Sequence, residues 1–447
     1  MILHAEVALL SDGWEDNVRL KIADGKIASL EIGAPAQGTD ERAKVILPAM
    51  PNLHSHAFQR AMAGLVETRG STADSFWSWR TLMYRFALTM TPDQMEAVAA
   101  QLYMEMLEAG FGRVGEFHYL HHDKDGGHYG NIAELSESIA SAASQTGIAL
   151  TLLPVLYAHS GFGGLEPSEG QRRFINSAES FARLLEGAAK AVSSLPESVV
   201  GVAPHSLRAV TPHELTIASQ LAPLAPLHIH ISEQVKEVED CIAWSGKRPV
   251  EWLLDNADVN DRWCLIHATH MTSEETVAVA RSSAIAGLCP ITEANLGDGT
   301  FPAQELLASG GAFGIGSDSN VLIGVSDELR QLEYSQRLLH RARNVVATAN
   351  GSTGRTLFDA ALKGGARALG VKAGIAVGQA ADFVSLSTAN APYLGCDNLL
   401  DGWIFGGLVK PETVWINGKA VVRDGLHVRR EAISARFRET MKELLSQ

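Results

Sequence analysis

Eight short apolar runs, separated by longer segments that carry helix-start signals, most constrain the fold of this chain. The runs cover residues 45–53, 113–117, 148–157, 199–204, 227–232, 263–267, 284–290 and 312–317. This alternation is typical of repeated strand–helix units, in which crossover helices join parallel strands. Eight such units close most naturally into a (β/α)8 barrel of the TIM type.

Three of the intervening segments begin with a threonine that is followed three residues later by a glutamine or glutamate. The pairs are Thr91 with Gln94, Thr211 with Glu214, and Thr272 with Glu275. This spacing predicts a capping box, which marks the N-terminus of a helix. An open, doubly wound sheet is the alternative arrangement of the same units. That fold would usually carry a G-x-G-x-x-G turn after the first strand, and no such turn stands there.

The two ends of the chain differ in pattern from its middle. Residues 1–47 and 372–428 contain short alternating strands and the hairpin signals Asp24-Gly25 and Asn417-Gly418. We therefore predict a small β-sandwich domain formed from both chain ends. Its first part is residues 1–47, the barrel is residues 48–371, and residues 372–447 supply its second part and a terminal helix.

The composition limits the classes of partner. A formal net charge of -14 argues against nucleic acid or an anionic membrane surface. We see no secretory signal and no apolar run that approaches the length of a membrane span. The four cysteines lie far apart without a C-x-x-C pair, which is typical of a reducing compartment. We therefore expect a cytoplasmic protein, in which an anionic ligand would need a local arginine cluster.

Residue types that bind metal ions stand at the ends of several predicted strands. His54 and His56 form an H-x-H pair at the end of the first strand, His230 ends the fifth, and Asp318 follows the eighth. A lone H-x-H pair can also be two polar residues flanking a strand end, but the carboxyl ends of barrel strands share one face. Three histidines and one aspartate suit one Zn²⁺ per chain with a position left for water, and Fe²⁺ fits the same ligands.

Two further residues are placed to assist such a site. Glu233 follows His230 by three residues, and a carboxylate there can take a proton from the bound water and deliver it to a leaving group. His267 closes the sixth strand and is expected to polarise the substrate. The alternative interpretations are a solvated acid at a helix start for Glu233 and a core histidine for His267.

This set of residues, taken in strand order, resembles the amidohydrolase superfamily and specifically its mononuclear deaminase branch. The resemblance covers nearly the whole chain, including the split β domain that these enzymes carry. The binuclear branch bridges its two metals with a modified lysine that closes the fourth strand. Here the fourth strand ends Val202-Ala203-Pro204-His205 and contains no lysine.

Longer motifs make the chain similar to the members of this branch that deiminate N-formimidoyl-L-glutamate. They lie at residues 51–64, 77–80 and 116–122, and at 204–208, where the sequence Pro-His-Ser-Leu-Arg replaces the Pro-His-Ser-Pro-Tyr that purine-type deaminases tend to have. Two arginines suit the two carboxylates of a glutamate derivative. A surface arginine beside two tryptophans is the alternative interpretation of Arg80. The resemblance implies that the substrate is bound by Gln59, Arg80, Tyr119, His205 and Arg208.

The implied reaction converts N-formimidoyl-L-glutamate and water into N-formyl-L-glutamate and ammonia, in histidine breakdown. The implied catalytic residues are Glu233, His267 and Asp318, the partner is a small formimidoyl amino acid, and the expected assembly is a homodimer. Deamination of a heterocycle such as guanine or a triazine is the rival reaction. A metal-free scaffold protein is a rival of another class, and the presence of all four ligands together with Glu233 argues against it.

Overall fold

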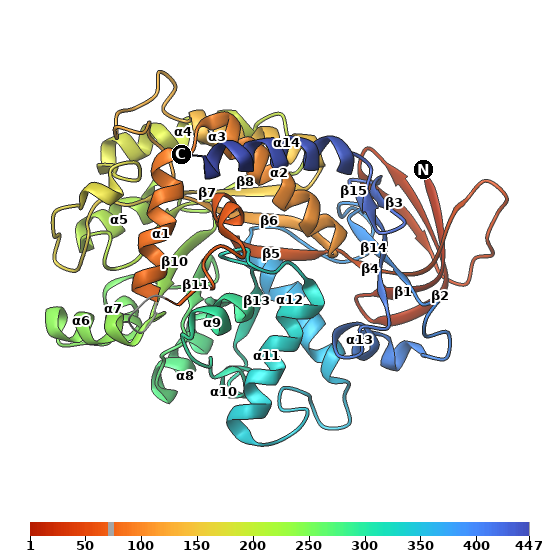
Figure 1. Ribbon diagram of the computed structural model, residues 1–447. Coiled ribbons are helices and arrows are strands. Elements are labelled where there is room, and N and C mark those ends of the chain that lie inside the picture. Colours follow the sequence, from red (N-terminus) through yellow and green to blue (C-terminus); the bar gives the residue numbers. More distant parts are fainter. Residues whose placement is uncertain (70–75, 447) are drawn as a thin grey trace.

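Parallel strands and helices alternate through the middle of the chain, as predicted. The computed structural model describes residues 1–69 and 76–446, and Figure 1 shows the barrel with the β domain beside it. The barrel strands are β5 (Met50–Ser55), β6 (Phe111–His118), β7 (Ala149–Leu156), β8 (Val199–Val200), β9 (Ala203–Pro204), β10 (Leu227–Ile231), β11 (Trp263–His267), β12 (Ile285–Leu288) and β13 (Ala312–Ile315).

These strands form two parallel sheets that meet to close the barrel. One sheet runs β5-β6-β7-β8, with β9 also paired to β7, and the other runs β10-β11-β12-β13. Bridges between Ser206 and His230 and between Ser55 and Asp318 join them on the two sides. The (β/α)8 prediction is therefore confirmed, with the fourth strand broken into the two short pieces β8 and β9.

Helices surround the barrel strands, and the predicted capping boxes are present. The backbone N–H of Gln94 donates to the Thr91 hydroxyl oxygen at 3.3 Å, and the Thr91 N–H donates to the Gln94 side chain at 3.0 Å. Thr211 and Thr272 make the same reciprocal bonds with their glutamates. The helices around the barrel are α1 (Phe76–Thr89), α2 (Pro92–Glu108), α3 (Glu134–Thr146), α4 (Ala178–Val192), α5 (Pro212–Leu221), α6 (Val235–Ser245), α7 (Pro249–Asn256), α8 (Ser273–Ser282), α9 (Pro290–Leu296), α10 (Ala303–Ala308), α11 (Val325–His340) and α12 (Thr353–Ala368).

Both chain ends contribute to the small β domain, as predicted. Its eight strands form one sheet in the order β17-β16-β15-β14-β4-β1-β2-β3. The hairpin signals are confirmed because Asp24, Gly25, Asn417 and Gly418 all have positive φ, as a type I′ turn requires. The strands are β1 (Ile2–Leu10), β2 (Gly13–Ala23), β3 (Lys26–Glu31), β4 (Glu41–Pro48), β14 (Phe383–Ser387), β15 (Lys410–Ile416), β16 (Lys419–Arg423) and β17 (Leu426–His427).

The prediction of one barrel strand over residues 45–53 is wrong in one respect. This run contains parts of two strands, which belong to different sheets. Strand β4 ends at Pro48 in the β domain, and β5 begins at Met50 in the barrel. The chain changes partners at once: the N–H of Ala49 donates to Asp382 O at 3.2 Å, and the N–H of Met50 donates to Gly110 O at 3.1 Å. A continuous apolar run carries no signal for this change, because both strands are buried.

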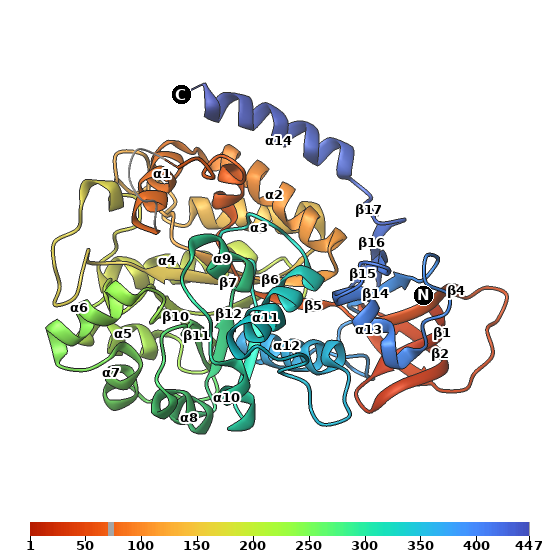
Figure 2. The ribbon, with the colours of Figure 1, turned by 60° about the horizontal axis from the view of Figure 1, so that its bottom comes forward.

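Two helices follow the barrel, α13 (Cys396–Ile404) and α14 (Arg430–Leu445). Figure 2 shows α14 lying along α2 rather than on the β domain. The Ser434 hydroxyl donates to Gln101 Oε1 at 3.1 Å, and Arg436 forms an ion pair with Glu96. The terminal helix therefore covers the barrel. Within residues 1–69 and 76–446, no helix has both the length and the apolar content that crossing a bilayer requires.

Candidate metal centre and substrate cavity

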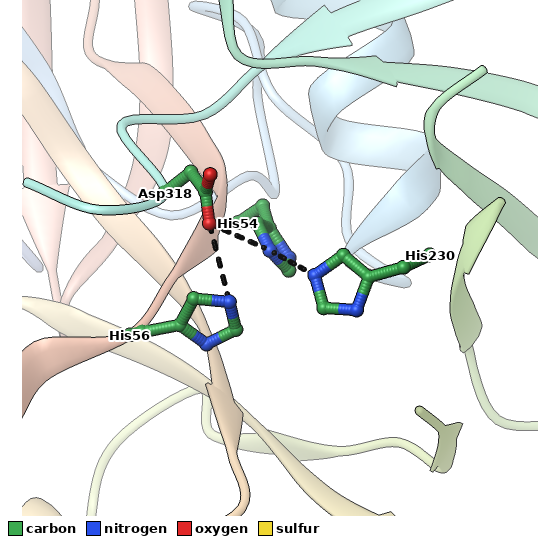
Figure 3. A group of neighbouring side chains, drawn as sticks. All are labelled: His54, His56, His230 and Asp318. Carbon is green, nitrogen blue, oxygen red and sulfur yellow. Dashed lines mark hydrogen bonds and ion pairs between the residues drawn. The ribbon is translucent and has the colours of Figure 1, made fainter. Parts of the chain in front are cut away.

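Four side chains from three barrel strands converge at one point, as Figure 3 shows. His54 and His56 come from the end of β5, His230 from β10, and Asp318 from the segment after β13. Asp318 Oδ1 lies 3.3 Å from His54 Nε2 and 3.1 Å from His56 Nε2, and His230 Nε2 lies 3.0 Å from His54 Nε2. The structure thus brings together all four predicted ligands.

The backbone brings Asp318 to the H-x-H pair. The Asp318 N–H donates to His54 O and the His56 N–H donates to Asp318 O, both at 3.0 Å. Gly316 permits this approach, because a β-carbon there would lie 2.8 Å from backbone atoms of His54. Asp318 itself has a φ of 44°, an uncommon conformation that turns the chain out of the strand.

The donor set fits a divalent metal ion. His56 Nδ1 lies 3.0 Å from Phe117 O and His230 Nδ1 lies 3.1 Å from His205 O. A carbonyl oxygen only accepts, so each Nδ1 carries the proton and each Nε2 directs a lone pair toward the cluster. Burial lowers the pKa of His54 to about 3, which keeps that imidazole neutral. Lone pairs and a carboxylate that crowd together are the arrangement that a cation stabilises.

Only one histidine of the His228-Ile229-His230 segment joins the cluster. His228 Nε2 lies 2.7 Å from the backbone oxygen of Ala368 and is fully buried. Its partner belongs to α12, whereas His230 is at hydrogen-bonding distance from His54. The structure therefore places in the cluster His230, the histidine of this segment that the sequence analysis named as a ligand.

Glu233 and His267 lie beside the four ligands. His267 Nε2 is 3.8 Å from Glu233 Oε1 and 3.9 Å from Asp318 Oδ2. Both side chains are buried, at 5% and 1% exposure. Burial raises the pKa of Glu233. For His267, burial lowers the pKa, but the surrounding carboxylates, Glu233 first among them, outweigh it and raise the pKa to about 10.

Glu293, on α9 after the seventh barrel strand, was missed by the sequence reasoning. Its Oε1 accepts the backbone N–H of Cys289 at 2.8 Å and lies 3.3 Å from His267 Nδ1. A carboxylate in this position orients the imidazole, so that Nδ1 donates to Glu293 and Nε2 faces Glu233 and Asp318. The sequence did offer one signal for Glu293, since it is a carboxylate in the first helical turn after a barrel strand.

A cavity opens above the cluster. All five predicted substrate-binding residues line it: Gln59, Arg80, Tyr119, His205 and Arg208. The Gln59 amide donates to the Tyr119 hydroxyl at 2.8 Å, which couples two of them. Several lining side chains were not anticipated, among them Tyr84, Tyr157, Phe174 and Leu296.

The two arginines have different surroundings. Arg80 Nη2 donates to the Tyr157 hydroxyl at 3.1 Å, and its guanidinium lies 5.2 Å from the centre of the Tyr84 ring. Arg208 is only 7% exposed, its buried Nε has no hydrogen-bond partner, and none of the ion pairs within the described part of the chain includes it. A buried cation without an acidic partner is costly, so the cavity favours an anionic ligand.

The fold and the site together define a class of enzyme. The chain belongs to the amidohydrolase family, whose model matches residues 45–421. A second model, described as "Formimidoylglutamate deiminase HutF, N-terminal domain", matches residues 1–44. Together the two matches span both the barrel and most of the β domain.

Individual relatives agree with this assignment. The chain is 52% identical over 451 residues to the formimidoylglutamate deiminase of Pseudomonas aeruginosa, and the match covers 99% of each chain. The crystal structure of an amidohydrolase from Brucella melitensis has a TM-score of 0.98 at 62% identity and also covers 99% of each chain. The 8-oxoguanine deaminase of Pseudomonas aeruginosa is 25% identical, over 91% of this chain and 90% of its own.

Proposed function

We propose that this enzyme hydrolyses N-formimidoyl-L-glutamate to N-formyl-L-glutamate and ammonia, as a step of histidine degradation. The observation that carries the proposal is the cavity in which Arg80 and the unpaired, buried Arg208 share one space with the ligand cluster. A glutamate derivative has two carboxylates for two guanidinium groups and an amidine for hydrolysis. The relative that is 52% identical over nearly the full length is named for this activity.

One divalent ion per chain would be held by His54, His56, His230 and Asp318. Three imidazole nitrogens and one carboxylate oxygen suit Zn²⁺, and Fe²⁺ is the alternative. When bound there, such an ion activates a water molecule as a nucleophile at neutral pH. That water would be the nucleophile that attacks the amidine carbon of the substrate.

The protein's own residues move the protons. Glu233 takes the two protons of the attacking water in turn and delivers each to the departing imino nitrogen, so that the C–N bond breaks, the formyl C=O forms and ammonia leaves. His267, oriented by Glu293 through Nδ1, directs its Nε2 toward the substrate's imino nitrogen and is 3.8 Å from Glu233. Asp318 holds the attacking water with the oxygen that faces His267.

The substrate is positioned by its charged groups. Arg208 and Arg80 each bind one carboxylate through charge-assisted hydrogen bonds. Gln59, Tyr119 and His205 complete the contacts, since all three side chains line the same cavity. A neutral heterocycle, such as the substrate named for the 25% identical 8-oxoguanine deaminase, would leave the buried Arg208 without a counter-charge.

The test is ammonia release from a panel of substrates. The panel contains N-formimidoyl-L-glutamate, N-formimidoyl-L-aspartate, formamidine, guanine and 8-oxoguanine. We expect the highest kcat/KM for N-formimidoyl-L-glutamate. Ammonia release from a purine without turnover of the formimidoyl amino acids would overturn the proposal. Metal analysis of the purified protein accompanies the panel, and a metal-free, inactive protein would favour a scaffold role.

A further inference from the structure

Tyr157, immediately after β7, is a buried residue of the cavity that the mechanism above does not use. Its side chain lines the cavity and is 3% exposed. Its hydroxyl oxygen accepts two hydrogen bonds, from Arg80 Nη2 at 3.1 Å and from Gln171 Nε2 at 2.8 Å. The ring packs against His205, with 4.4 Å between ring centroids, which holds the hydroxyl in place.

The directions of these two hydrogen bonds are fixed by their neighbours. A guanidinium group can only donate. Gln171 Oε1 accepts both the backbone N–H and the hydroxyl of Ser168, at 2.8 Å and 2.9 Å, so the amide nitrogen must face Tyr157. The Tyr157 oxygen is therefore an acceptor in both bonds, and both of its lone pairs are occupied.

The proton of the Tyr157 hydroxyl is left without an acceptor. No side chain or carbonyl among the described residues accepts from it, and the side chain borders the cavity. A buried donor without a partner costs free energy, whereas a ligand oxygen beside Arg80 would accept from both groups at once. The Arg80–Tyr157 pair is thus a two-residue anion site within the cavity.

We propose that Tyr157 donates its hydroxyl proton to the substrate carboxylate that Arg80 binds, and that this is the distal carboxylate. This inference rests on the proposed function. In a formimidoyl amino acid the amidine nitrogen and the α-carboxylate share one carbon, so the α-carboxylate stays near the metal ligands. Arg208 follows His205 by three residues, and the His205 carbonyl oxygen accepts from His230 Nδ1. We therefore assign Arg208 to the α-carboxylate. Arg80 and Tyr157 are left to bind the distal carboxylate.

The experiment compares two substrates on the Tyr157→Phe variant of the metal-loaded enzyme. N-formimidoyl-L-glutamate has a distal carboxylate and N-formimidoylglycine has none. We expect kcat/KM to fall roughly ten- to a hundredfold on the first substrate and less than about twofold on the second, mainly through KM. Tyr129→Phe is the matched control, because the Tyr129 hydroxyl also accepts from an arginine, Arg173 at 3.3 Å, but does not line the cavity.

A double-mutant cycle separates direct contact from an effect exerted through Arg80. In the Arg80→Met background, a direct donor still lowers kcat/KM for N-formimidoyl-L-glutamate when Tyr157 becomes Phe, by about threefold or more. No further loss in that background, or equal losses on the two substrates in the single variant, would overturn the inference and leave the proposed function standing. Failure of the unmodified enzyme to act on N-formimidoyl-L-glutamate would instead overturn the proposed function, and this inference with it.

Discussion

Three of the four proposed metal ligands line one cavity with the two arginines, but the fold holds the two groups in different ways. His54 and His230 stand on barrel strands, His56 directly follows β5, and backbone carbonyls fix the rings of His56 and His230. Arg80 belongs to α1, and Arg208 lies in the turn after β9. In the proposed function, the strand ends therefore supply the reaction centre, while the connecting segments supply substrate recognition. Such a division lets one barrel serve different substrates through changes in its connections.

The largest expected effect tests the residues at the strand ends, which we propose as metal ligands. His54→Ala removes a ligand whose Nε2 lies within 3.3 Å of both Asp318 Oδ1 and His230 Nε2. We expect loss of the bound metal and a decrease of roughly a thousandfold or more in kcat. Metal analysis and ammonia release measure the two quantities. His213→Ala, an exposed histidine on α5, is the control, and full metal content in His54→Ala would refute the ligand assignment.

The next effect separates proton transfer from metal binding. Glu233 lies beside His267 and outside the group of four converging ligand atoms. Glu233→Gln should therefore retain the metal, while kcat falls by roughly a hundredfold or more through lost acid–base catalysis. The two readouts are metal content and the single-turnover rate. Loss of metal in this variant would make Glu233 a ligand and contradict the mechanism.

A smaller effect tests the connecting segments. Arg208→Met removes the unpaired cation, and a charge-assisted pair is worth about 1.5 to 3 kcal/mol. The kcat/KM for N-formimidoyl-L-glutamate should fall roughly ten- to a hundredfold, with unchanged metal content. The kcat/KM for formamidine, which has no carboxylate, should fall much less. Arg183→Met is the control, because Arg183 forms an exposed ion pair with Glu179. An equal decrease in kcat/KM for both substrates in Arg208→Met would assign Arg208 a structural role.

The smallest expected effect concerns Glu293, the carboxylate that orients His267. Glu293→Gln keeps an oxygen that accepts from Cys289 N–H and His267 Nδ1 but removes the negative charge. We expect kcat to fall about tenfold with little change in KM, since outer partners of a catalytic histidine tune its orientation and basicity. Steady-state kinetics with metal analysis provide the measurement. An unchanged kcat would show that the ring does not depend on this carboxylate.

The sequence predicted the strand side of the site well, because its signals are local. H-x-H at the end of a strand and a histidine three residues before a glutamate are visible in the sequence, and the structure places them together. Tyr157 also ended a predicted run, but nothing local showed that Gln171 and Arg80 would occupy its hydroxyl oxygen. Contacts between distant segments depend on packing, which periodicity does not report.

The same distinction explains the misassigned first strand. Hydrophobic periodicity reports burial, and both halves of the 45–53 run are buried. It does not report which sheet buries them. The change at Ala49 is defined by its hydrogen bond to Asp382, more than three hundred residues later in the chain. The role of the five predicted substrate residues likewise remains a prediction, although the structure places all of them on one cavity.

The register of β4 also has a consequence for how the chain is made. Leu47 of β4 pairs with Val384 of β14, so one edge of this strand has no partner until the C-terminal segment has been synthesised. At about 5 to 20 residues per second, that delay is on the order of tens of seconds. Throughout it, the nascent chain exposes a strand edge directly before the H-x-H segment. Completion of the β domain is therefore a late event in biogenesis, and an exposed edge of this kind is a site where chaperones or neighbouring chains can pair.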